Sequence, residues 1–158
     1  MLLDFNPQEY PSNAPMGPLK LEWAILRIVD VKEEKEGVRT IKRKLRIVFE
    51  VVMKDATDRM LCYRCVYLDG HSAEAQSRSA QFLADLCRIL GIERLFNSDQ
   101  LIGRMCVAHL THSVSGYVPN MFRAACPTDF ERLREGLPIM EDYGDATTSN
   151  RSETEKIV

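Results

Sequence analysis

Alternating cations and spaced tyrosines are the residues of this chain with the most evident chemical use. Lys42, Lys44 and Arg46 stand at every second position, so on a β-strand their side chains share one face. Tyr63 and Tyr67 are four positions apart and would share a face of another strand. Spaced cations contact phosphates, and exposed aromatic rings stack on bases for roughly 1–3 kcal/mol each. The pattern predicts a surface that binds single-stranded nucleic acid; the alternative is an ordinary solvated face beside half-buried tyrosines.

Further contact residues are expected beside these two segments. Arg64 lies between the tyrosines, and a second group follows a hairpin turn at residues 115–116. In an OB-fold this hairpin is one of the loops that close over a ligand. The predicted nucleic-acid-binding residues are therefore Lys42, Lys44, Arg46, Tyr63, Arg64, Tyr67, Tyr117, Phe122 and Arg123.

Motifs that would indicate catalysis are absent from the sequence. No phosphate-binding GxxxxGK[ST] loop occurs, and no GxGxxG follows an expected strand. Cys62 and Cys65 form a C-x-x-C inside an expected strand, where positions three apart face opposite sides, so we interpret both as structural. We therefore expect no catalytic residue, no metal and no cofactor. The enzymatic alternative is a metal-dependent nuclease, for which the carboxylates offer no convincing pair.

Composition indicates a single-domain globular protein. The chain has 158 residues, of which 45% are hydrophobic and 28% charged. No apolar run reaches the roughly 18 residues that cross a bilayer. The first 15 residues lack the basic and apolar regions of a signal peptide, and the five cysteines have no disulfide-like spacing, which suits a reducing compartment. We expect a cytoplasmic protein.

The charges are distributed unevenly along the chain. Residues 20–127 carry 17 Lys and Arg against 13 Asp and Glu, whereas the two ends carry 4 and 10. A mildly basic body between acidic ends is expected of a domain that meets a polyanion.

Hydrophobic periodicity predicts five strands and one main helix. Strands are expected over residues 21–31, 40–53, 60–68, 104–113 and 117–126, and the charged residues 32–37 are expected to form a turn. On the second strand Leu45, Ile47 and Phe49 face the core. A helix is predicted between Ser72, as its N-cap, and Gly91, as its C-cap. Shorter helical turns are expected at residues 98–101 and 129–136.

This element order predicts a mainly β protein. One helix between the third and fourth of five strands is the connectivity of an OB-fold barrel, which commonly binds oligonucleotides. Pro119 indicates that the fifth strand is an edge or is bulged. We expect an extended segment over residues 1–18, an OB-like domain over 19–127, and a short helix with a disordered acidic tail over 128–158.

The segment from Pro15 to Cys126 resembles a family of small phage proteins regarded as single-stranded DNA-binding proteins with an OB-like fold. The resemblance is carried by WAILRIVDVKEEKEG, LRIVFEVV, FLADLCRILGI and LIGRMCVAHL, and by a final hairpin that contains Asn120. It implies binding of single-stranded DNA with little sequence preference during phage replication or recombination, in the cytoplasm of an infected cell. The acidic tail would then recruit replication or recombination proteins.

Two further possibilities stay open at this stage. The same barrel could hold a host protein, as an interaction module or an inhibitor. The fifth strand, if it is an exposed edge, could pair with a second copy and form a homodimer.

Overall fold

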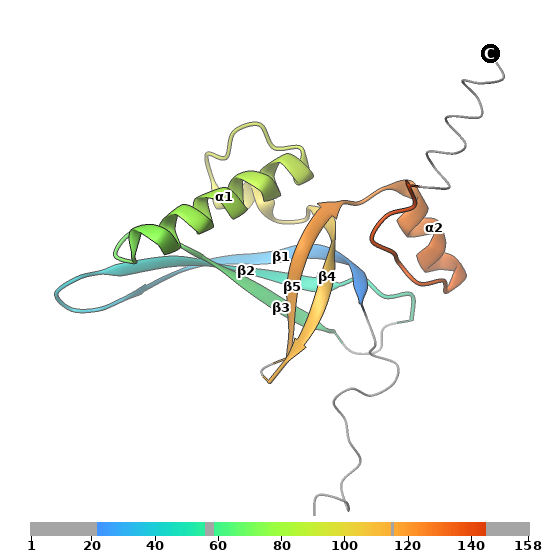
Figure 1. The fold of residues 1–158 in the computed structure, drawn as a ribbon, viewed down its shortest axis with the longest axis horizontal. Coiled ribbons are helices and arrows are strands. Elements are labelled where there is room, and N and C mark those ends of the chain that lie inside the picture. The colour runs from blue at the N-terminus through green and yellow to red at the C-terminus, as the bar shows by residue number, and fades with distance from the viewer. Residues whose placement is uncertain (1–21, 56–58, 115, 145–158) are drawn as a thin grey trace, which may run out of the picture.

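The computed structural model describes residues 22–55, 59–114 and 116–144, which form one sheet, a long helix packed on it and a shorter helix at one end (Figure 1). In chain order the elements are β1 (Trp23–Glu36), β2 (Lys42–Val51), β3 (Leu61–Tyr67), α1 (Ala73–Leu90), the short 3-10 helix η3 (Ser98–Leu101), β4 (Met105–Ser113), β5 (Gly116–Ala124) and α2 (Pro127–Glu135). The predicted extended segment 1–18, the hairpin-turn residue 115 and the predicted tail beyond residue 144 lie outside the described residues.

The five strands form one antiparallel sheet in the order β3-β2-β1-β4-β5. The predicted mainly β fold, with one long helix between the third and fourth strands, is confirmed. The predicted closed barrel is not: within the described residues β3 and β5 are both edge strands, with no ladder between them. The sheet nevertheless curls enough to bring the two edges into contact, and Arg64 Nη1 of β3 donates to the Pro119 carbonyl of β5 at 3.0 Å.

The core fills the space between the curled sheet and α1. Ile47 and Phe49 of β2 are fully buried, as the alternation of that strand predicts, and Leu86 of α1 packs on the same cluster. Burying one such side chain contributes about 1.5–3 kcal/mol. The opposite face of β2 carries Lys42, Lys44, Arg46 and Glu50.

Local chemistry sets both ends of α1. The Ser72 Oγ accepts from the Ala75 N–H at 3.1 Å, and Gly91 ends the helix in the left-handed region at φ 74°. Both caps were predicted from sequence and are confirmed. The helix is therefore held at a defined length beside β3, where Ser79 accepts a hydrogen bond from the Tyr67 N–H at the outer edge of the strand.

The charged residues 32–36 belong to β1, so their prediction as a turn was wrong. They pair with β2 in register, Glu34 opposite Lys44 and Glu36 opposite Lys42. These two pairs of opposite charges stabilise the pairing, whereas Lys32 and Lys35 stand opposite Arg46 and Arg43. No local pattern in residues 32–36 reveals β2 as their partner. A register shift between Ile28 and Asp30 also moves the later residues of β1 to the other face of the sheet.

Candidate nucleic-acid interface

The predicted tyrosines lie on β3 and are accessible. Tyr63 is 45% exposed and Tyr67 is 39% exposed, so neither is a core packing residue. The Arg46 guanidinium lies 4.4 Å from the centre of the Tyr63 ring. The centres of the His71 and Tyr67 rings are 4.7 Å apart. The structure thus brings the cations of β2 and the tyrosines of β3 together, as the sequence predicted.

The cations of β2 are engaged with carboxylates. Arg46 Nε lies 3.2 Å and Lys44 Nζ 3.9 Å from the Glu34 carboxylate of β1. Lys42 is exposed and stands opposite Glu36. The predicted row of cations is therefore interleaved with a row of acids, because residues 32–36 continue as a strand. This face is close to charge balance and offers a polyanion little attraction.

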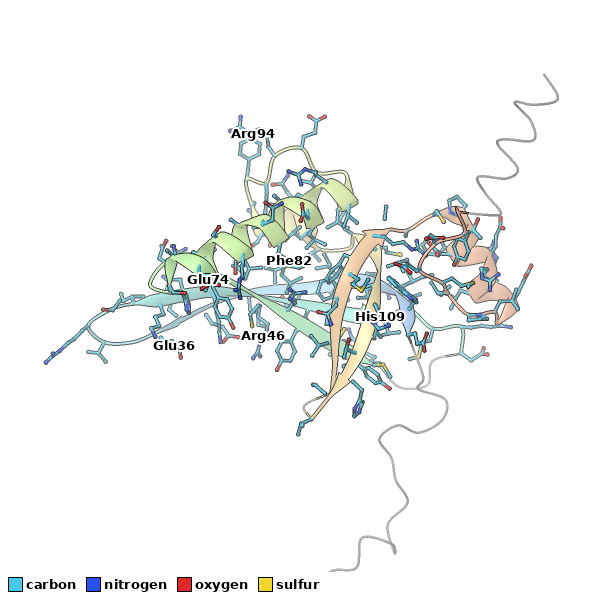
Figure 2. The ribbon with its side chains drawn as sticks, viewed as in Figure 1. Glu36, Arg46, Glu74, Phe82, Arg94 and His109 are labelled. Atoms are coloured by element: carbon cyan, nitrogen blue, oxygen red, sulfur yellow. The ribbon has the colours of Figure 1, made fainter. Side chains whose placement is uncertain are left out.

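A cavity of about 400 Å³ opens between the edge of β3, the first half of α1 and the start of β5. We call it the tyrosine groove. Three tyrosines and two arginines contribute to its walls, together with Ser79 and Phe82 of α1: Tyr63, Tyr67, Tyr117, Arg64 and Arg78. Four of these five were predicted as contact residues. Figure 2 shows Phe82 between α1 and the strands, and Arg46 on the side of the sheet away from α1.

Arg64 is the central cation of the groove. Its guanidinium lies 4.4 Å from the centre of the Phe82 ring and donates to the Pro119 carbonyl. Among the described residues it has no carboxylate within salt-bridge distance, and burial lowers the pKa of its guanidinium. A half-buried cation that has exchanged water for a ring and one carbonyl is a favourable partner for an incoming anion.

The backbone of β3 adds polar groups to the groove. The Val51 N–H donates to the Met60 carbonyl, so the alternation of an antiparallel ladder directs residues 60, 62, 64 and 66 toward β2. Tyr63 and Cys65 then direct their N–H and C=O groups to the open edge. The Tyr67 N–H points the same way and donates to Ser79 Oγ at 2.9 Å. These edge groups could hydrogen-bond a base.

Phe122 and Arg123 have structural roles that the sequence did not indicate. The Phe122 ring packs 5.5 Å from Phe49 and 5.3 Å from Phe82 between their centres. Both Arg123 Nη atoms bond the Asp129 carboxylate, at 2.9 and 2.6 Å. Arg123 thus lies outside the groove, and Phe122 is a partly buried ring that packs against the core and borders a neighbouring cavity.

Arg78, Ser79 and Phe82 were missed as candidate site residues. They occupy one face of α1, since positions three and four apart on a helix are neighbours. An arginine on that face, four residues before Phe82, was the only available signal. The sequence could not indicate that this face borders the open edge of β3. Arg78 pairs with Glu74, and both side chains are largely exposed.

The two cysteines of the C-x-x-C face opposite sides of β3. Cys62 is buried in the core, which raises the pKa of its thiol to about 11, whereas Cys65 borders the groove. No cluster of His, Cys, Asp or Glu that could hold a metal ion occurs in residues 22–55, 59–114 and 116–144. Within those same residues no helix combines the length and apolar character needed to cross a membrane.

No family model, curated protein or solved structure matches this chain. The resemblance to phage single-stranded DNA-binding proteins therefore stays a prediction, and the site rests on its own geometry.

Proposed function

We propose that this protein is a non-catalytic binder of single-stranded DNA that uses the tyrosine groove. The observation that carries the proposal is the convergence of three tyrosines with Arg64, which among the described residues forms no salt bridge, on one ligand-sized cavity. Rings supply stacking to any base, and the arginines supply phosphate contacts, so sequence preference would be small. The cations of β2 have a secondary part, because Lys44 and Arg46 are paired with Glu34.

The OB-like barrel belongs to the same proposal. The strand order, and the helix between β3 and β4, have OB connectivity if β3 and β5 are taken as the pair that would close the barrel. The assignment to DNA, to phage replication or recombination in the host cytoplasm, and to partners held by the acidic tail follows from the resemblance alone.

Removing one ring at a time tests the groove. Fluorescence anisotropy with labelled oligo(dT) should show that Tyr63→Ala and Tyr67→Ala each weaken binding by about 1–3 kcal/mol, and that Tyr63→Phe retains it. Phe96→Ala is the matched control, because Phe96 is 79% exposed in the loop after α1, away from the groove. An equal loss in the control, or no binding at low salt and micromolar protein, contradicts the proposal.

The second candidate is a module that binds a host protein. The charge balance between Glu34 and the cations of β2 favours it, since protein interfaces do not require a strongly basic surface. Failure of oligo(dT) to bind would leave this candidate as the better one.

A further inference from the structure

A second cavity adjoins the tyrosine groove. It has a volume of about 490 Å³ and lies between α1 and β5, with Asn120, Met121 and Phe122 among its lining residues. Three residues border both cavities: Arg64, Arg78 and Phe82. The two arginines therefore stand at the junction between two spaces, each of ligand size.

We propose that the two cavities form a dinucleotide site in which one phosphodiester lies on Arg64 and Arg78 and one base enters each cavity. The inference rests on the proposed function and specifies its ligand. The first base meets Tyr63 and Tyr67 in the groove. The second meets the Phe82 and Phe122 rings, which lie 5.3 Å apart between centres.

Charge supports the phosphate position. Arg64 is half-buried with a carbonyl and a ring as its partners, and among the described residues no carboxylate lies within salt-bridge distance of it, so a phosphate oxygen would be its ionic partner. Asp85, which also borders the second cavity, is paired with Arg88. Among the described residues Arg78 pairs with the exposed Glu74 alone, and that pairing competes weakly with a phosphate. Beyond these two arginines, the neighbouring Lys44 and Arg46 are already paired with Glu34.

The backbone supports the position of the first base. Tyr63 and Cys65 present N–H and C=O groups at the open edge of β3, where the edge of a base could bond them. The contacts of the two cavities thus serve one nucleotide step. Binding should then saturate at a length of two nucleotides.

A length series tests the proposal by competition against labelled oligo(dT). The unlabelled ligands are thymidine monophosphate, the dinucleotide TpT, and chains of three to eight thymidines. We expect TpT to compete at least tenfold better than the mononucleotide, and longer chains to gain no more than the number of two-nucleotide registers they contain, about sevenfold for eight thymidines. Affinity that climbs steadily with length, with TpT inactive, overturns the dinucleotide site and leaves the proposed function standing. Absence of binding by every ligand overturns both.

The phosphate position has its own test. TpT with a neutral methylphosphonate linkage should bind at least tenfold more weakly than TpT, and Arg64→Gln should abolish that difference. Arg78→Gln, on the exposed face of α1, should reduce the difference even if the Arg64 variant does not fold. Arg94→Gln is the matched control, since Arg94 stacks on Phe96 outside both cavities. Equal binding of the charged and neutral linkages by the unmodified protein overturns the assignment of Arg64 and Arg78.

Discussion

Asp129 is a buried acidic residue whose carboxylate is held by several hydrogen bonds. Its side chain is fully buried and accepts hydrogen bonds from Arg123, from the Cys126 N–H at 2.8 Å and from the Tyr143 hydroxyl at 2.7 Å. Burial alone would raise the pKa of Asp129, but these hydrogen bonds outweigh it and hold the pKa below its ordinary value. One carboxylate thus ties β5, α2 and the segment after α2 together.

Acid should remove this stabilisation. A carboxylate with a lowered pKa contributes stability above its unfolded pKa of about 3.9, and loses it as the pH falls through the lower folded value. At pH 7 Asp129→Asn should reduce the free energy of unfolding by roughly 3 kcal/mol, because Arg123 loses its counter-charge. Urea unfolding between pH 7 and pH 3 should show that the difference in free energy of unfolding between the native protein and this variant becomes smaller below about pH 4.

Asp85→Asn is the control for that measurement. Its side chain is 51% exposed and pairs with Arg88, so the change should be below about 1 kcal/mol. A gap between the native protein and the Asp129 variant that is constant with pH would contradict the assigned role of the carboxylate.

At the scale of elements, β3 is defined by its two different edges. One edge pairs with β2 over its whole length. The other edge faces β5 and has no ladder of backbone hydrogen bonds among the described residues. Side chains bond there instead: Arg64 donates to the Pro119 carbonyl, and Ser79 accepts from the Tyr67 N–H. Pro119 has no N–H to donate, which suits its place on an edge strand. This open edge creates the tyrosine groove.

Hydrogen exchange should report the two edges separately. In the free protein the amides of Cys62 and Arg64 should exchange slowly, because they bond β2, and those of Tyr63 and Cys65 should exchange faster. The Tyr67 amide should be protected by Ser79 and lose that protection in Ser79→Ala, as followed by NMR. Equal protection along β3 would mean that its outer edge is paired in solution.

At the scale of the whole molecule, most charged side chains of the β1–β2 hairpin form ion pairs and do not gather into a patch of one sign. The β1–β2 hairpin, which extends past the N-terminal end of α1 in Figure 1, carries the alternating charges of residues 32–36 and 42–46. Its ion pairs include Arg43 with Glu33 at 2.6 Å and with Asp69 at 2.7 Å. The basic excess seen along the sequence therefore does not become a basic face on this hairpin.

Salt dependence should reflect this pairing. With one or two phosphates bound, the slope of log K against log salt for oligo(dT) should lie between about −0.7 and −1.4. Contacts from Lys42, Lys44 and Arg46 in addition would bring it to about −3.5. Anisotropy titrations from 50 to 300 mM salt distinguish these two slopes. The steeper slope would show that the cations of β2 contact DNA.

The sequence by itself determined the features that depend on neighbouring residues. The ends of α1 follow from Ser72 and Gly91, the core face of β2 follows from strict alternation, and the order of elements follows from both. Tertiary structure alone decided which elements meet. Residues 32–36 continue β1 because they pair with β2, which places Glu34 opposite Lys44 and Glu36 opposite Lys42. Arg123 is bound to the buried Asp129, and Arg78 borders the same cavity as the tyrosines because α1 lies beside the open edge of β3. These outcomes depend on pairing between distant segments, which a local period of two or 3.6 residues does not encode.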